Sequence, residues 1–94
     1  MRYRVYVDDN FHYMDKSERY KLGEFDTLEA AVAACTKLVD EFLVSNYRPG
    51  MTAGELMEQY AFFGEDPFIL AGDGTVPFSA RDYASYRVKE ICRD

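Results

Sequence analysis

The segment from Asp26 to Asn46 has the spacing of one face of an α-helix. Its hydrophobic side chains recur at positions i, i+3, i+4 and i+7, as Leu28, Ala31, Val32, Cys35, Leu38, Val39, Phe42 and Leu43. Polar or small residues occupy most of the other positions, and this pattern predicts an amphipathic helix. Such a helix must cover an apolar surface. Because the flanking segments alternate like short strands, the sequence predicts a small α+β domain.

Two segments before this helix have the alternation of β-strands. Residues 2–7 place Tyr3, Val5 and Val7 on one face and Arg2, Arg4 and Tyr6 on the other. Residues 19–25 alternate again, and Gly23 interrupts their pattern as a candidate β-bulge. We therefore expect an antiparallel hairpin with a long connecting loop.

The first helix has two candidate N-caps. Asp26 with Glu29 three residues later resembles a capping box, while Thr27 is a competing cap one residue further on. Pro49 cannot continue a helix, so we expect the helix to end near residues 45–46. The sequence leaves its first residue open between two adjacent positions.

A second, shorter helix is expected between Thr52 and Gly64. Thr52 and Glu55 form a clear capping box, and glycine is a common residue at the end of a helix. The apolar side of this helix would consist of Leu56, Met57, Tyr60 and Phe63.

A second hairpin and a third helix complete the chain. Residues 67–70 form a short apolar run, the turn at 72–74 is typical of hairpins, and residues 76–78 would be the returning strand. Because Pro77 has no backbone N–H, that strand should be short or lie at an edge. Ser79 then has the position of an N-cap for the last helix.

The expected order of elements is therefore β-β-α-α-β-β-α. A chain of 94 residues has the usual size of one domain. We predict a single α+β domain over residues 1–94, with an antiparallel sheet of three or four strands and the helices packed on one of its faces.

The chain has a formal net charge of −6 at pH 7. Nucleic-acid binding relies on Lys and Arg that neutralise phosphates, so this charge argues against a nucleic-acid partner. It also disfavours anionic membrane surfaces, and no apolar run approaches the ~20 residues that cross a bilayer. The N-terminus alternates instead of forming an apolar signal segment, so we expect a cytoplasmic protein without a membrane partner.

The segment from Asp8 to Asp15 is the one candidate metal site. It brings Asp8, Asp9, His12 and Asp15 within eight residues, and carboxylate and imidazole groups are common ligands of divalent metals. The calcium-loop template fails here, because its glycine and glutamate positions hold Tyr13 and Arg19. The segment can also be a solvated loop whose polar side chains bond to their own backbone. A metal-binding protein or a small metal-dependent enzyme is thus the alternative function, and no other cofactor is indicated.

No pattern in the sequence predicts a catalytic nucleophile or a phosphate site. None of the serines lies in a Gly-x-Ser-x-Gly elbow. The glycine-rich segment 72–75 lacks the lysine of a phosphate-binding loop. We therefore name no catalytic residue and favour a non-enzymatic protein.

Aromatic residues are the strongest indication of function. Eight Tyr and seven Phe exceed what a small core needs, and exposed aromatic and Arg side chains are typical of protein interfaces. The candidate partner surface consists of Arg4, Tyr6, Phe62, Phe63 and Phe68. Arginines near these rings, Arg19 among them, suggest cation–π contacts. The leading hypothesis is an interaction or regulatory module that binds a protein partner or a second copy of itself.

Three segments of the chain resemble segments of a known protein family. They are residues 20–30 (YKLGEFDTLEA), residues 63–69 (FGEDPFI) and residues 78–84 (FSARDYA). In these segments the chain resembles a family of small uncharacterised bacterial proteins with no assigned activity. The resemblance implies a bacterial, single-domain protein. It implies no cofactor and no site residue.

Overall fold

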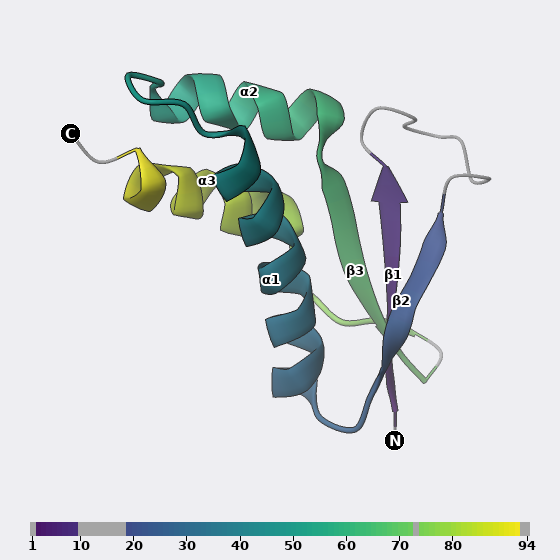
Figure 1. The fold of residues 1–94 in the computed structure, drawn as a ribbon. Helices are drawn as coiled ribbons and strands as arrows, with labels where there is room; N and C mark the ends of the chain where they lie inside the picture. Colours follow the sequence, from purple (N-terminus) through teal and green to yellow (C-terminus); the bar gives the residue numbers. More distant parts are fainter. Residues whose placement is uncertain (1, 10–18, 73, 93–94) are drawn as a thin grey trace.

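The computed structural model describes residues 2–9, 19–72 and 74–92 (Figure 1). Their elements are β1 (Tyr3–Asp9), β2 (Tyr20–Phe25), α1 (Leu28–Asn46), α2 (Ala53–Phe63), β3 (Glu65–Ala71), β4 (Gly74–Thr75) and α3 (Ala80–Ile91). The predicted order β-β-α-α-β-β-α and the α+β class are confirmed.

One antiparallel sheet holds all four strands, in the order β2-β1-β3-β4. The central strands β1 and β3 pair along their full length, from Tyr3 opposite Ala71 to Asp9 opposite Glu65. Figure 1 shows α1 along one face of this sheet, and α2 and α3 pack against α1 and against each other. The sheet therefore has an inner face, which points toward the helices, and an outer face, which points away from them.

The pairing of β1 with β2 contains a bulge. Val5 lies opposite Gly23 while Tyr6 lies opposite Lys21, so Leu22 is the extra residue. The sequence predicted an irregularity at the adjacent glycine. Because of the bulge, Lys21 and Glu24 point to the same face, and their side chains form an ion pair there. In a regular strand, residues three apart would lie on opposite faces.

The core has two clusters that meet along α1. On the inner face of the sheet, Val5 and Ile69 are fully buried against Ala31 and Cys35 of α1. The second cluster lies among the three helices and consists mainly of Val39, Leu43, Leu56, Tyr60, Ala84 and Val88. The predicted apolar face of α1 thus serves both the sheet and the other helices.

Side chains cap the start of each helix. For α1 the structure selects Thr27, whose Oγ1 accepts a hydrogen bond from the Ala30 N–H at 3.1 Å. Asp26 is therefore not the N-cap. Thr52 and Glu55 form the predicted capping box of α2, with bonds of 3.1 and 2.9 Å. Each cap satisfies an N–H group that the helix itself leaves unpaired.

The sequence predicted a returning strand at 76–78, and this position is wrong. The strand β4 is Gly74–Thr75 and pairs only with the last two residues of β3. Val76 still donates a backbone hydrogen bond to Ile69 at 2.9 Å, but Phe78 donates back to Val76 at 2.8 Å. This tight turn, together with the missing N–H of Pro77, takes the chain out of the sheet before α3.

The junction between α2 and β3 depends on a glycine. Gly64 caps α2, and the Tyr60 hydroxyl reaches past it to donate a hydrogen bond to the Glu65 carbonyl at 2.8 Å. A Cβ on Gly64 would lie 2.5 Å from Cδ1 of Tyr60, which is closer than atoms can approach. The close contact of this ring with the backbone sets the direction in which β3 leaves the helix.

Candidate functional site

The outer face of the sheet is the candidate site. On β1 it carries Arg4, Tyr6 and Asp8, and directly opposite them on β3 it carries Leu70, Phe68 and Asp66. These six side chains are half-buried, whereas the residues that alternate with them in the middle of each strand are buried. Alternation along two paired strands thus builds a surface of mixed aromatic and charged character.

Two aromatic rings lie at its centre. Tyr6 and Phe68 stack across β1 and β3 with 6.1 Å between ring centroids and 25° between ring planes. Stacked cross-strand rings on the central strands present a continuous apolar surface. The pair lies on the face that none of the three helices covers (Figure 1).

Arg19 completes the aromatic pair. Its guanidinium carbon lies 5.0 Å from the centroid of Phe68, which is a cation–π distance. The same guanidinium donates two hydrogen bonds to Asp8, from Nε at 2.6 Å and from Nη2 at 3.1 Å. This bidentate bond, which raises the pKa of Arg19, holds its guanidinium over the ring. The cation–π contact expected from the sequence is confirmed for Arg19.

Asp66 is the electrostatically unfavourable group of this face. It lies directly opposite Asp8, and two like charges in that position repel. Burial raises its pKa, the charge of Asp8 raises it further, and Arg81 acts in the opposite direction. The ionised carboxylate therefore costs stability where it lies.

The predicted partner surface divides into two parts. Arg4, Tyr6 and Phe68 share the outer face, where Arg4 also donates a hydrogen bond to the Gly72 carbonyl at 3.0 Å. Phe62 and Phe63 belong instead to the last turn of α2 and are 64% and 54% exposed. Their rings lie 6.4 Å apart. The structure thus groups three of the five predicted residues.

The predicted metal ligands are described only in part. Asp8 is held by Arg19, and Asp9 lies opposite Glu65. His12 and Asp15 lie outside the described residues. Within residues 2–9, 19–72 and 74–92 no group of three His, Cys, Asp or Glu side chains is close enough to hold a metal. Metal binding by this segment stays a prediction.

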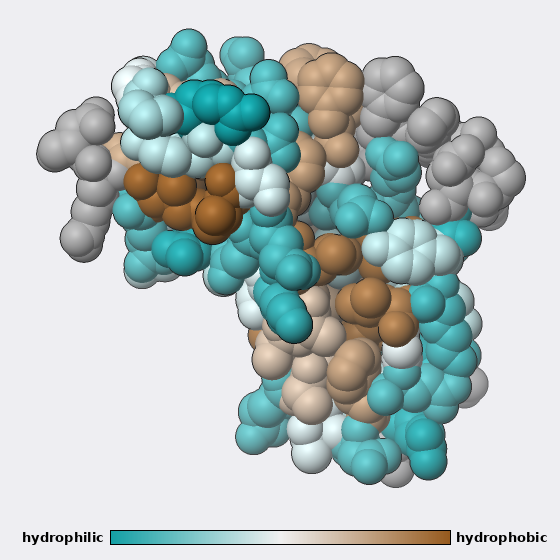
Figure 2. All heavy atoms as spheres, in the orientation of Figure 1, coloured by the Kyte–Doolittle hydropathy of each residue, from teal (hydrophilic) through white to brown (hydrophobic). Residues whose placement is uncertain are grey.

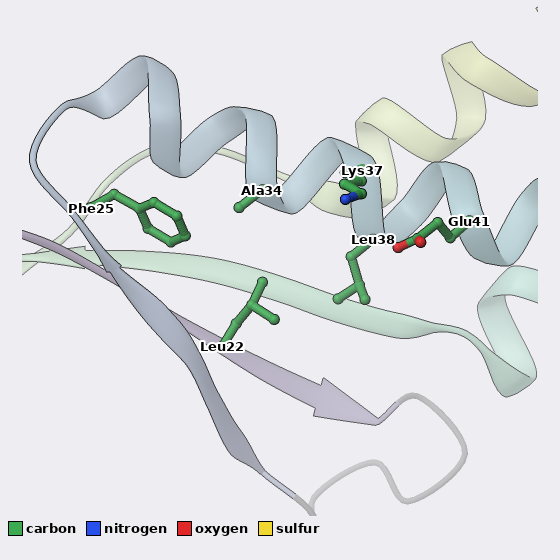
Figure 3. Close-up of a pocket in the computed structure, with 6 residues that line it drawn as sticks. All are labelled: Leu22, Phe25, Ala34, Lys37, Leu38 and Glu41. Carbon is green, nitrogen blue, oxygen red and sulfur yellow. The ribbon is translucent and has the colours of Figure 1, made fainter.

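An open groove between α1 and β2 was not predicted. It has a volume of about 280 Å³ and is lined by Leu22, Phe25, Ala34, Lys37, Leu38 and Glu41 (Figure 3). Figure 2 shows hydrophobic side chains at the surface in this region. The groove exists because the bulge turns Leu22 toward the helix. The sequence indicated an irregularity at Gly23, but strand pairing decides which residue is the extra one, so the orientation of Leu22 and the groove beside it were not predicted.

The chain matches no protein-family model, and no curated protein matches it. In the described part of the chain, no helix is both long and apolar enough to cross a membrane. The fold and the site define a small α+β domain with one helix-covered and one helix-free sheet face.

Proposed function

We propose that this protein is a non-enzymatic interaction module that binds a partner protein through the outer face of its sheet. The observation that carries the proposal is the stacked Tyr6–Phe68 pair on the central strands, with Arg19 fixed against it. Aromatic and Arg side chains that are already ordered lose little entropy on binding, and they are the residues that dominate interface energies.

The charges of the outer face indicate the chemistry of the partner. Although the whole chain has a net charge of −6, this face carries more cations than anions among the described residues. The cations are Arg2, Arg4, Arg19 and Lys21, and the anions are Asp8, Glu24 and Asp66. We expect a partner segment that places an apolar side chain on the ring pair and a carboxylate beside Arg4.

The proposal is tested by quantitative affinity capture with matched variants. Wild-type protein, Phe68→Ser and Tyr86→Ser serve as baits. Tyr86 is a suitable control because it lies on α3, on the other side of the sheet, and is 65% exposed. The captured partner should be lost with Phe68→Ser and kept with Tyr86→Ser.

Direct binding is then measured with the captured protein in purified form. A loss of at least about tenfold in affinity for Phe68→Ser, with no change for Tyr86→Ser, supports the proposal. Equal affinity of both variants would refute it. Circular dichroism confirms that each variant is folded.

The proposal includes a cytoplasmic location. Cys35 and Cys92 are both buried and form no disulfide, as expected in a reducing compartment. Fractionation of cells that express the tagged full-length protein tests this part.

A further inference from the structure

The end strand β2 has an edge that stays unpaired within the described part of the chain. It is the first strand of the order β2-β1-β3-β4, and no described residue pairs with its outer side. Its side chains are accessible, with Tyr20 42% and Leu22 37% exposed. An edge of this kind can add a further strand, and its backbone N–H and C=O groups provide the hydrogen bonds.

Along β2, the order in which side chains point to the inner and the outer face is symmetric. Tyr20, Gly23 and Phe25 lie opposite inner-face residues of β1, and Leu22 lines the groove below α1. Lys21 and Glu24 point to the outer face. From residue 20 to residue 25 the order is inner, outer, inner, inner, outer, inner, which is the same in both directions.

The bulge produces this symmetry. A regular strand of six residues would alternate strictly, so its first and last residues would lie on opposite faces. Two copies of such a strand could not pair about its midpoint with their helices on the same side. Two copies of the bulged strand can pair in this way, because every residue then lies opposite a residue that points to the same face.

We propose that β2 pairs antiparallel with β2 of a second copy of this chain. The two-fold axis would be perpendicular to the sheet and pass between Leu22 and Gly23. The interface is then isologous and joins the two sheets into one of eight strands. This inference does not rest on the proposed partner of the outer face.

The charges of β2 are complementary in this arrangement. Lys21 lies opposite the partner's Glu24, and by symmetry Glu24 lies opposite the partner's Lys21. Opposite charges in directly paired positions stabilise an antiparallel pair, and like charges there destabilise it. Both side chains are accessible, at 41% and 35%.

The apolar side chains are complementary as well. Leu22 lies opposite the partner's Gly23, which has no side chain in its way. A Cβ at Gly23 would lie 3.4 Å from Cζ of Phe25, so this ring borders the space above the glycine. The partner's Leu22 would therefore pack beside Phe25. The groove of Figure 3 and its copy in the second chain would then join, with Leu22 and Phe25 of both chains between the two α1 helices.

Charge reversal tests the proposal. Wild-type protein, Lys21→Glu, Glu24→Lys and the double variant are compared by sedimentation velocity from about 1 to 200 µM, the range of weak to moderate dimers. We expect a wild-type dimer, a dissociation constant at least about tenfold higher for each single variant, and recovery in the double variant. Circular dichroism shows whether each variant is folded.

A mixture of the two single variants distinguishes the effect of the contact between chains from the effect of losing the ion pair within one chain. Each single variant has lost its internal Lys21–Glu24 pair, yet in a mixed dimer both contacts between the chains are again of opposite charge. The mixture should therefore dimerise more tightly than either variant alone. A monomeric wild-type protein, single variants that dimerise like wild type, or a mixture without recovery would each overturn the proposal.

Discussion

The two faces of the sheet are built from the same strands but are stabilised differently. On the inner face, Val5, Val7 and Ile69 have no exposed surface, and Val5 and Ile69 pack against Ala31 and Cys35 of α1. On the outer face, Tyr6 and Phe68 are half-buried and stack on each other, and Arg19, the residue before β2, lies over the Phe68 ring. Adjacent residues of one strand thus belong to two different environments.

The difference separates stability from recognition. Burial of aliphatic side chains against a helix stabilises the fold, and such a surface has no capacity left for a partner. The outer face is ordered by a ring pair and by the bidentate Arg19–Asp8 bond, yet it keeps apolar area accessible. Substitutions on the two faces should therefore affect different properties.

The largest contrast is expected between neighbours on β3. Ile69→Ala should lower the free energy of unfolding by about 2–5 kcal/mol, because it leaves a cavity under α1. Phe68→Ala should cost only about 1–2 kcal/mol, from the ring pair and part of its burial. Urea denaturation of both variants measures the difference. Equal costs would mean that the outer face is a second core.

The next effect concerns the glycine before β3. Gly64→Ala should lower the free energy of unfolding by about 1–3 kcal/mol, since its Cβ would collide with the buried Tyr60 ring. Gly54→Ala is the matched control. Its Cβ would have ordinary contacts, so alanine in α2 should raise stability by about 0.5–1 kcal/mol. Thermal denaturation compares the two, and destabilisation of similar size in both would contradict the account.

A smaller effect is expected where α1 contacts α3. The Tyr83 hydroxyl donates a hydrogen bond to Asp40 at 2.8 Å, and Arg87 Nε donates to the same oxygen at 3.0 Å. Tyr83→Phe should cost about 0.5–1.5 kcal/mol because the hydroxyl bond is lost. Tyr86→Phe, on the exposed side of α3, should have no effect. A change in unfolding free energy for Tyr86→Phe but not for Tyr83→Phe would be the opposite of this prediction.

The smallest effect depends on pH. Because burial and Asp8 raise the pKa of Asp66, the folded protein holds its proton more tightly than the unfolded chain. Stability from this group therefore falls as pH rises through the interval from the ordinary value of 3.8 to the raised one. Asp66→Asn should raise stability by about 0.2–1 kcal/mol at pH 7. It should give no gain at pH near 3, below both pKa values, as urea denaturation at the two pH values would show. A gain of the same size at both values would argue against the electrostatic cause.

Local patterns predicted most of the fold. The period of residues 28–43 located α1 and its buried side, and the capping box at Thr52 located α2. Alternation along β1 separated the two faces correctly. These features depend on residues within one or two turns of each other, so a single sequence contains them.

Features that depend on pairing were not predictable. The extra residue of the bulge is Leu22 and not the glycine beside it, because the register with β1 decides which residue is left unpaired. The contact of Arg19 with Phe68 joins residues far apart in the sequence, and only the order of strands brings them together. That Phe68 joins Arg4 and Tyr6 on the outer face, while Phe62 and Phe63 do not, has the same origin.

The most direct test of the outer face uses the aromatic ring signals of the labelled protein in NMR. Titration with the purified partner should shift the Tyr6 and Phe68 ring signals and leave the Tyr86 signals on α3 unchanged. Shifts confined to Tyr86 or other helix residues, with Tyr6 and Phe68 unaffected, would contradict the account.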